Sequence, residues 1–377
     1  MKTKYVIGLN SGTSFDGIDV ALVKFKKNDL TPIFIDGIVC DYPRHIKEKI
    51  YKLIIGAHHD MTTKKLSRLD IILGNLFANA ALKIIKKNKL KKEDVLLIAS
   101  HGQTIYHKPK VKSIQIGNGK IITKKIGIKT INNFREGDIK AGGEGAPLMP
   151  YLDWIIFNKS KNIKAVLNIG GISNVTVVGK NIIPIAFDIG PGNALIDLIA
   201  KKYFRKDFDL NGNIASKGKI DLKSIEIALK DPYFKKRPPK STGKEYFNQE
   251  FIDKYFLKIK NKQNKIATVT YFTTKVIEQS FRDFIFPKYA VKELVVSGGG
   301  VKNKTLMRHL TFLVGACWSK SVRITISDKY KLPTKYKEAI LFALLGYTCH
   351  LRKKNNMPSC TGAKKEVILG KIINVSG

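Results

Sequence analysis

The chain has 377 residues, of which 44% are hydrophobic and 9% are aromatic. This length predicts two domains, each with a core of its own, and the lack of any run of about 18 apolar residues argues against a membrane-spanning helix. The formal net charge is +38, but the basic residues are mostly lysines spread along the chain, which argues against a nucleic-acid partner that would need clustered cations.

The four cysteines indicate neither a disulfide framework nor a zinc site. Cys40, Cys317, Cys349 and Cys360 are scattered, with no C-x-x-C pair and no cysteine and histidine spacing suited to zinc. We therefore expect reduced thiols and a cytoplasmic location.

The chain opens with a strand, a polar turn and a second strand, at residues 5–9, 10–17 and 18–25. Apolar runs that flank a turn of glycine, serine and aspartate are typical of a hairpin. The next predicted elements are a strand at residues 31–40, helices at residues 44–56 and 66–87, strands at residues 95–99 and 114–116, and a helix at residues 147–157.

The pattern starts again near residue 164. A strand at residues 165–169, a small polar turn and a strand at residues 175–178 repeat the opening hairpin, and a strand at residues 183–187 follows. The remaining predicted helices are at residues 222–229, 249–259, 266–286, 305–314 and 336–351, and the remaining predicted strands are at residues 293–297 and 322–326. The repetition predicts a duplicated α/β fold with a cleft between two lobes.

Two glycine-rich turns, one at the start of each half, have the composition of a phosphate-binding loop. Glycines let backbone N–H groups approach an anion, hydroxyls add donors, and a carboxylate such as Asp16 can hold magnesium through water. Ordinary hairpin turns have the same composition, and it is the equivalent position in both halves that favours a nucleotide site. The residues concerned are Gly12, Thr13, Ser14, Phe15, Asp16, Gly17, Ile18 and Asp19 in the first turn, and Gly170, Gly171, Ser173 and Asn174 in the second.

One carboxylate stands at the end of an apolar strand. Asp188 follows residues 183–187 and precedes a turn that contains Gly190 and Asn193. A strand fixes the direction of a general base, and glycines leave room for a substrate. Asp188 is therefore the candidate base and a candidate magnesium ligand, with Gly190 and Asn193 as candidate substrate contacts. The alternative is that Asp188 only shapes the turn or caps the following helix.

A third glycine-rich strand exit follows the predicted strand at residues 293–297. Gly298, Gly299 and Gly300 could pass beneath an adenine or a ribose, where side chains would collide. The sequence has no complete P-loop, no dinucleotide-binding fingerprint, no H-E-x-x-H and no G-x-S-x-G. These absences argue against redox, zinc and P-loop chemistry.

Two polar segments remain as candidate sugar contacts. His101 and Gln103 follow a strand end and can bind hydroxyl groups, although a histidine there can also be merely solvated. Arg135 lies in a segment rich in glycine and charge. It could bind a carboxylate such as a lactyl group through a two-pronged contact, or form a surface salt bridge instead.

In their order along the chain, these segments resemble the motifs of the anhydro-N-acetylmuramic acid kinase family. The matching segments are GTSFDGID, HGQTIYH, FREGDIKAGGEGAPLMP, NIGGISNVT, FDIGPGN, STGKEYFN, SGGG and KEAILFALLG, and the likeness extends from residue 7 to about residue 347. The resemblance implies the duplicated ribonuclease-H-like fold of actin and hexokinase, with ATP and Mg2+ in a cleft between two lobes. We place the lobes at residues 1–134 and 135–377, and leave open that the C-terminal segment packs back on the first lobe.

The same resemblance implies a reaction and residue roles. In this family, water opens the anhydro bridge of the sugar while the freed 6-hydroxyl takes the γ-phosphoryl group of ATP, giving N-acetylmuramic acid 6-phosphate for peptidoglycan recycling. Asp188 matches the aspartate that activates the water, residues 12–19 match the ATP phosphate loop, Arg135 matches the substrate arginine, and Glu338 matches a glutamate near the site. Glu338 also has a rival role, as a charge that complements a helix dipole.

Three other functions stay open. A plain sugar kinase would phosphorylate an open hydroxyl, a nucleotide-gated binding protein would share the fold without a small substrate, and a polyanion-binding protein would use the positive charge. We expect a small amino sugar as the partner, no nucleic acid or membrane, and a homodimer if the chain associates.

Overall fold

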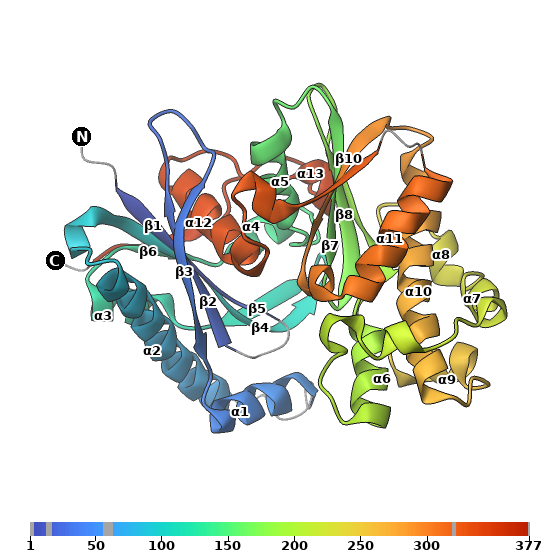
Figure 1. Cartoon of the computed structure of the whole chain (residues 1–377). Coiled ribbons are helices and arrows are strands. Elements are labelled where there is room, and N and C mark those ends of the chain that lie inside the picture. Colours follow the sequence, from blue (N-terminus) through green and yellow to red (C-terminus); the bar gives the residue numbers. More distant parts are fainter. Residues whose placement is uncertain (1–3, 13–16, 56–62, 319–321, 376–377) are drawn as a thin grey trace. The chain divides into compact units, whose positions relative to one another are not determined.

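The computed structural model describes residues 4–12, 17–55, 63–318 and 322–375 (Figure 1). The chain forms two compact units. The first combines Met1–Ile156 with Lys331–Gly377, and the second is Phe157–Tyr330. Within the described ranges, no helix has the length and apolar character needed to cross a membrane.

The first unit is built on a seven-stranded sheet with the order β12-β6-β4-β1-β2-β3, in which β5 also pairs with β4. β1, β2 and β3 form an antiparallel meander, whereas β4 runs parallel to β1, and β6 runs parallel to β4. The strands are β1 (Tyr5–Ser11), β2 (Gly17–Lys24), β3 (Ile33–Asp41), β4 (Val95–Lys108), β5 (Lys112–Ile116), β6 (Thr130–Asn132) and β12 (Lys371–Ile373). The helices are α1 (Arg44–Ile55), α2 (Thr63–Lys87), α3 (Gly119–Ile126), α4 (Glu136–Lys140), α5 (Met149–Phe157), α12 (Lys337–His350) and α13 (Pro358–Thr361).

Helices α2 and α12 pack on opposite faces of this sheet. Because successive strand residues point to opposite faces, Ile7 and Leu9 of β1 join the hydrophobic cluster that includes α2, while Gly8 faces α12. A Cβ at Gly8 would lie 1.9 Å from the backbone oxygen of Ala339, so only glycine allows α12 to approach. Figure 1 shows α12, from late in the chain, beside β1 and β2 from its beginning.

The second unit repeats the same topology. Its five-stranded sheet has the order β11-β10-β7-β8-β9, with an antiparallel meander from β7 to β9 and with β10 and β11 in the parallel direction. Strand for strand, this order matches β6-β4-β1-β2-β3 of the first unit, which confirms the predicted duplicated α/β fold of the ribonuclease-H-like type. The elements are β7 (Ile163–Ile169), β8 (Ile172–Val178), β9 (Ile185–Pro191), β10 (Val291–Ser297), β11 (Arg323–Ile326), α6 (Ala194–Phe204), α7 (Leu222–Ala228), α8 (Pro232–Lys235), α9 (Gln249–Phe256), α10 (Lys262–Ser280) and α11 (Lys304–Cys317).

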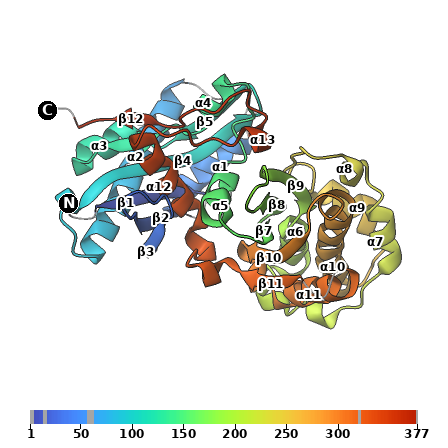
Figure 2. The ribbon, with the colours of Figure 1, turned by 90° about the horizontal axis from the view of Figure 1, so that it is seen from above.

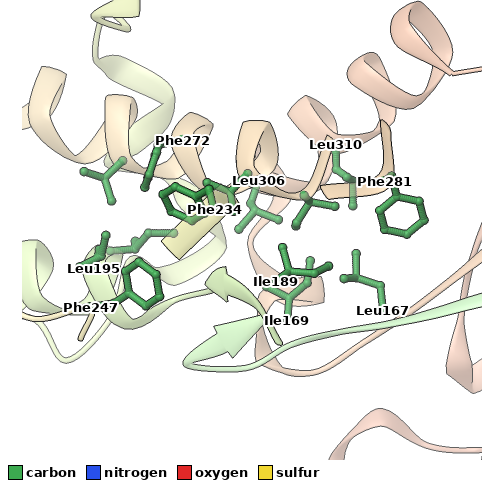
Figure 3. Packing of buried hydrophobic residues seen from close by; sticks show 14 of the residues in the cluster. Leu167, Ile169, Ile189, Leu195, Phe234, Phe247, Phe272, Phe281, Leu306 and Leu310 are labelled. Carbon is green, nitrogen blue, oxygen red and sulfur yellow. The ribbon is translucent and has the colours of Figure 1, made fainter. Parts of the chain in front are cut away.

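The core of the second unit lies between this sheet and its helices. Figure 3 shows Ile169 and Ile189 of the sheet close to Leu306 and Leu310 of α11, and α10 lies beside α11 (Figure 2). Full burial of one such side chain contributes about 1.5 to 3 kcal/mol. Ile169 directly precedes the Gly170 turn, and Ile189 follows Asp188, so the core fixes the strand ends that carry the candidate site.

Several boundaries differ from those predicted. The strand expected at residues 95–99 continues to Lys108, because the part beyond Gly102 pairs with β5. The helix expected at residues 266–286 ends at Ser280 and passes into a π-helical turn. The short strands β6 and β12 were not predicted, since three residues carry too little periodicity to be recognised.

The division of the chain also differs from the expected boundary between residues 134 and 135. Residues 135–156 belong to the first unit, where Asp138 accepts hydrogen bonds from Asn356 and Thr361 near the end of the chain. β12 pairs with β6 and α12 packs on β1. The first unit is therefore completed by the C-terminal segment, and the second unit is inserted between its two parts.

Candidate active site

In the second unit, the turn between β7 and β8 is bonded to the turn between β9 and α6. The amides of Gly192 and Asn193 donate to the carbonyl oxygens of Gly171 and Gly170, both at 2.8 Å, and the amide of Ala194 donates to Gly171 at 3.1 Å. The Asn193 side chain also donates to the Gly170 oxygen at 3.1 Å. These bonds hold the first turn against the start of α6.

Glycine is required where these backbones meet. A Cβ at Gly192 would lie 2.3 Å from the Gly170 oxygen. Gly298 has a φ of 89°, and a Cβ there would lie 2.5 Å from the oxygen of Ile169. The exit from β10 therefore packs directly on the end of β7.

Gly299 and Gly300 continue this convergence. A Cβ at Gly300 would lie 2.4 Å from Cγ2 of Ile169, whereas the nearest atom to a Cβ at Gly299 would be Nδ2 of Asn193, at 3.8 Å. The exits from β7, β9 and β10 thus lie together within one unit. Backbone without side chains is the surface that a nucleotide ring or phosphate can approach closely.

Three other predicted residues of this unit lie in β8 and β9. Ser173 is fully buried and donates to the carbonyl oxygen of Pro191 at 3.3 Å. A Cβ at Gly190 would lie 2.9 Å from Phe234. Ser173 and Gly190 therefore support the turns from within the unit, whereas Asn174 is partly exposed and stands opposite Asp188 in the sheet.

Asp188 is held through its backbone and its carboxylate. Its amide donates to the carbonyl oxygen of Lys240 at 3.0 Å, and its own carbonyl accepts from the hydroxyl of Tyr233 at 2.7 Å. The amide of Thr242 donates to Oδ2 of Asp188 at 3.0 Å. A hydrogen bond to a carboxylate favours its charged form, so the segment at residues 240–242 both orients this carboxylate and supports its negative charge.

Lys240 brings a positive charge near this carboxylate. Its Nζ lies 4.8 Å from the ring centre of Tyr233 and 4.9 Å from that of Phe284. Burial lowers the pKa of Lys240 to about 8, while the negative charges of Asp283 and Asp188 oppose this shift. The ammonium group is thus still largely protonated at neutral pH.

In the first unit, Gln103 of β4 lies at the base of the Gly12–Asp19 loop. The hydroxyl of Ser11 lies 2.6 Å from Oε1 of Gln103 and 2.8 Å from the Gly17 oxygen, and its single proton can serve one of them at a time. Nε2 of Gln103 donates to the Gly12 oxygen at 3.4 Å. Gln103 therefore holds the Gly12 end of this loop, and Ser11 lies beside its Gly17 end.

Arg135 and His101 form a direct pair. Nε of Arg135 donates to Nε2 of His101 at 3.1 Å, and Nη1 donates to the Gly145 oxygen at 2.9 Å. Because Nε2 of His101 accepts this bond, the imidazole is neutral with its proton on Nδ1, which lies 3.3 Å from the Gly102 oxygen. Burial, followed by the charge of Arg135, lowers the pKa of His101 well below its usual value.

Glu338 and Asn10 complete a polar cluster around Arg135. Burial lowers the pKa of Arg135 to about 10, and the carboxylate of Glu338 opposes that shift. Glu338, in the first turn of α12, accepts a hydrogen bond from Nδ2 of Asn10 at 2.5 Å. We call Asn10, His101, Arg135 and Glu338 the Arg135 cluster.

Asp138 organises the glycine-rich segment that follows Arg135. Its fully buried carboxylate accepts from the Gly145 amide and the Thr361 hydroxyl, both at 2.8 Å, and from Asn356 at 3.1 Å. The carbonyl of Gly145 in turn accepts from Arg135. Asp138 thus fixes one of the two groups that orient the Arg135 guanidinium.

The Gly12–Asp19 loop is described only in part. Thr13, Ser14, Phe15 and Asp16 lie outside the described residues. Among the described residues, none has an atom within 4 Å of a Cβ built at Gly12, whereas a Cβ at Gly17 would lie 2.4 Å from the Cys40 oxygen, and Ile18 is buried in the core. Gly17 and Ile18 therefore have packing roles, and Asp19 stands opposite Asn10 in the β1–β2 ladder.

The described residues are compatible with a magnesium ion bound mainly through phosphate. Within the described ranges, no group of three or more His, Cys, Asp or Glu side chains could hold a metal ion. Mg2+ usually takes one or two carboxylates and completes its shell with water and phosphate oxygens, so Asp188 fits such a role. The second predicted ligand, Asp16, lies outside the described residues.

The predicted site residues thus fall into two groups. Asn193 and the glycines at residues 170, 171 and 298–300 meet in the second unit, and Asp188 lies in β9 of the same unit. The first unit brings together the Arg135 cluster and places Gln103 beside the Gly12–Asp19 loop. Sequence reasoning missed three groups of residues. Asn10 and Ser11 are polar at the end of an apolar strand and could have been found there, whereas Tyr233 and Thr242 are remote from Asp188 in the sequence and gave no signal. Asp138 belongs to the charged, glycine-rich segment around Arg135, and nothing in the sequence indicates that its carboxylate is buried.

The comparisons with known proteins agree over nearly the whole chain. A family model described as anhydro-N-acetylmuramic acid kinase matches residues 4–375. The anhydro-N-acetylmuramic acid kinase of Caldanaerobacter subterraneus subsp. tengcongensis is 40% identical over 389 residues, with 98% of this chain and 96% of that protein covered. The protein of that name from Francisella tularensis subsp. novicida is 39% identical over 387 residues, with 98% of each covered.

Solved structures give a more distant likeness. Component A of (R)-2-hydroxyglutaryl-CoA dehydratase from Acidaminococcus fermentans aligns with a TM-score of 0.46 and 16% identity, covering 92% of this chain and 98% of that one. A ROK family glucokinase from Streptomyces griseus aligns with a TM-score of 0.39 and 9% identity, covering 90% and 97%. Because these TM-scores are below 0.5, the assignment of the fold depends on the strand order described above and not on these structures.

Proposed function

The chain belongs to the anhydro-N-acetylmuramic acid kinase family and phosphorylates anhydro-N-acetylmuramic acid with ATP in peptidoglycan recycling, and we propose which of its residues carry out the reaction. The observation that carries the proposal is the strand-end carboxylate of Asp188, held by the Thr242 amide beside converging glycine-rich turns.

Asp188 is the general base. Water adds to C1 of the sugar and gives a proton to the Asp188 carboxylate, while the bond between C1 and O6 breaks. O6 attacks the γ-phosphorus, and the bond from that phosphorus to the ADP oxygen breaks. The proton then passes to solvent. The Thr242 amide orients the carboxylate and the Tyr233 hydroxyl holds the backbone carbonyl of the same residue, as a positioned base requires.

The nucleotide lies against the glycine-rich backbone. In the second unit, Gly298, Gly299 and Gly300 provide a surface without side chains for the adenosine, and Gly170 and Gly171 provide one for phosphate. The Gly12–Asp19 loop of the first unit is the other proposed phosphate-binding segment. Its residues Thr13 to Asp16 lie outside the described residues, so this assignment rests on the sequence.

Arg135 binds the lactyl carboxylate of the sugar. Its Nε and Nη1 are fixed by His101 and Gly145, and a guanidinium has further N–H groups with which to hold a carboxylate. His101 and Gln103 are proposed to contact the sugar, His101 also by holding Arg135. Glu338 balances the charge of Arg135, and Asn193 is the proposed sugar contact in the second unit. Gly190, the other residue expected to contact the sugar there, is buried with Phe234 at its Cβ position and supports the turn from within the unit.

Asp188 and Asp16 are the proposed carboxylates for Mg2+. When bound, the ion offsets charge on the transferred phosphoryl oxygens. We also place the enzyme in the cytoplasm, because it uses ATP and its four cysteines are free thiols. We expect a homodimer if the chain associates, and no affinity for nucleic acid.

The test is a reaction in water enriched in oxygen-18, with ATP, Mg2+ and the anhydro sugar. The expected product is N-acetylmuramic acid 6-phosphate with the label at C1. A phosphorylated sugar with its anhydro ring intact would identify a plain sugar kinase. ATP hydrolysis that is indifferent to the sugar would identify a nucleotide-gated binding protein.

A further inference from the structure

The segment at residues 241–247 is fixed at both ends. The Thr242 amide bonds to Asp188, and Phe247 is fully buried, with its ring centre 5.1 Å from that of Phe251. The amide of Phe247 also donates to the Gly243 oxygen at 3.3 Å. Lys244 stands between these anchors, so the backbone that carries it is held in place.

Lys244 lies across the turn between β7 and β8. A Cβ at Gly171 would lie 2.5 Å from Cε of Lys244 and 3.4 Å from its Nζ. The aliphatic stem therefore passes directly over the glycine backbone, and the ammonium group stands beside the turn. A side chain at position 171 would displace the end of this flexible side chain.

The surroundings do not neutralise this ammonium group. The carbonyls of Gly170 and Gly171 already accept bonds from the start of α6. Lys244 is exposed, and it forms no ion pair with any residue in the described part of the chain. Burial raises the pKa of Asp197 to about 6, the charge of Lys244 opposes this rise, and Asp207 adds to it. Asp197 is thus an electrostatic neighbour of Lys244 without being its ion-pair partner.

We infer that Lys244 binds a phosphate group of the nucleotide at the Gly170–Gly171 turn, an inference that rests on the nucleotide site proposed above. The ammonium stands beside this turn and supplies a positive charge with rotatable donors, which suits a phosphate oxygen. The same segment holds Asp188 through Thr242, so one short stretch of chain would place the nucleotide charge and the base together.

The experiment measures binding of adenosine, AMP, ADP and a non-hydrolysable ATP analogue to the full chain by calorimetry, with Mg2+ and without sugar. Lys244→Met removes the charge at nearly constant length. It should weaken at least one phosphorylated nucleotide about ten- to a hundredfold, the range of a hydrogen bond to a charged group, and leave adenosine within about twofold. Lys223→Met, at an exposed lysine of α7, is the matched control and should change no affinity.

Two results would overturn the inference. One is unchanged affinity of Lys244→Met for every phosphorylated nucleotide, or an equal loss for adenosine. The other concerns Asp197→Asn. This variant is expected to bind the ATP analogue at least as tightly as the wild type does. An equal loss in Asp197→Asn and Lys244→Met would show that Lys244 acts only as the neighbour of Asp197. If the wild type bound no ATP analogue, the proposed function itself would fail, and this is distinguishable from both results.

Discussion

Oδ2 of Asp188 accepts a hydrogen bond from the backbone amide of Thr242 at 3.0 Å. A backbone amide cannot lose its proton or swing away as a side chain can, so this contact gives the carboxylate a fixed orientation within the second unit. The Tyr233 hydroxyl bonds to the backbone of the same residue at 2.7 Å. The proposed base is therefore fixed from two directions by residues more than forty positions further along the chain.

Asp188→Asn should remove the base and keep the structure. Asparagine can present its carbonyl oxygen to the Thr242 amide, so the contact survives while the proton acceptor is lost. We expect sugar-dependent turnover to fall by about a hundred- to ten-thousandfold, with the midpoint of thermal unfolding unchanged. Retention of sugar-dependent turnover would rule out Asp188 as the base.

Arg135→Lys should separate binding of the lactyl carboxylate from binding of the rest of the sugar. Lysine keeps the charge but cannot hold His101, Gly145 and a carboxylate in one planar arrangement. The KM for the acidic sugar should rise about tenfold or more. Binding of an anhydro sugar without the lactyl group should be unchanged, and an equal loss for both sugars would contradict the assignment.

The Arg135–His101 contact also predicts how stability depends on pH. Burial and the charge of Arg135 lower the pKa of His101 well below 6.5, so below about pH 6.5 the unfolded chain binds a proton that the folded chain does not. The free energy of unfolding should therefore decrease as pH falls, by up to about 1.4 kcal/mol per pH unit for this one group.

His101→Gln isolates that contribution, because glutamine does not titrate and its side-chain oxygen can still accept from Arg135. Urea unfolding of both proteins at pH 7.5, 6.5 and 5.5 is the measurement. The stability advantage of the wild type should shrink as pH falls. A constant difference would mean that His101 has the same pKa in the folded and unfolded chain, which would contradict its burial beside Arg135.

Part of this architecture was predictable because it depends on local patterns. The sequence of strand, polar turn and strand occurs in both halves. Glycines at residues 170, 171 and 298–300 indicate backbone that a ligand or another segment approaches closely. The return of α12 and β12 to the first unit was not predictable, because the bonds from Asn356 and Thr361 to Asp138 join distant residues without any local signature. The contact from Thr242 to Asp188 could not be predicted from residue type either, because every residue except proline has the same backbone amide.

Gly192→Ala should separate the two turns of the second unit. The added Cβ would lie 2.3 Å from the Gly170 oxygen, so the hydrogen bonds from Gly192 and Asn193 to the first turn could not persist. We expect loss of nucleotide affinity and a destabilisation of about 1 to 3 kcal/mol. Gly315→Ala is the matched control, since no atom of the described residues lies within 4 Å of its Cβ position, and this change in α11 should stabilise by about 0.5 to 1 kcal/mol. Equal nucleotide affinity in the two variants would contradict the role of the paired turns.

In the second unit, several polar side chains bond to the carboxylate of Glu293. This buried carboxylate of β10 accepts from Lys164 of β7, from the Tyr330 hydroxyl at 2.6 Å and from Thr325 of β11 at 2.7 Å. Although burial raises its pKa, these bonds outweigh burial and hold the pKa at about 2. The stability that Glu293 contributes is therefore present above about pH 4.5, the ordinary range of a glutamate, and is lost as pH falls from there toward 2.

Glu293→Gln should consequently destabilise the second unit by about 3 to 5 kcal/mol at neutral pH, because it leaves the Lys164 ammonium buried without its counter-charge. Adding Lys164→Met should restore part of the loss, since the double variant buries no unpaired charge. Urea unfolding at pH 7 and at pH 3.5 provides the check, and the gap between the wild type and Glu293→Gln should be smaller at the lower pH. A double variant no more stable than Glu293→Gln would show that the loss comes from the hydroxyl contacts of Tyr330 and Thr325 and not from the stranded charge.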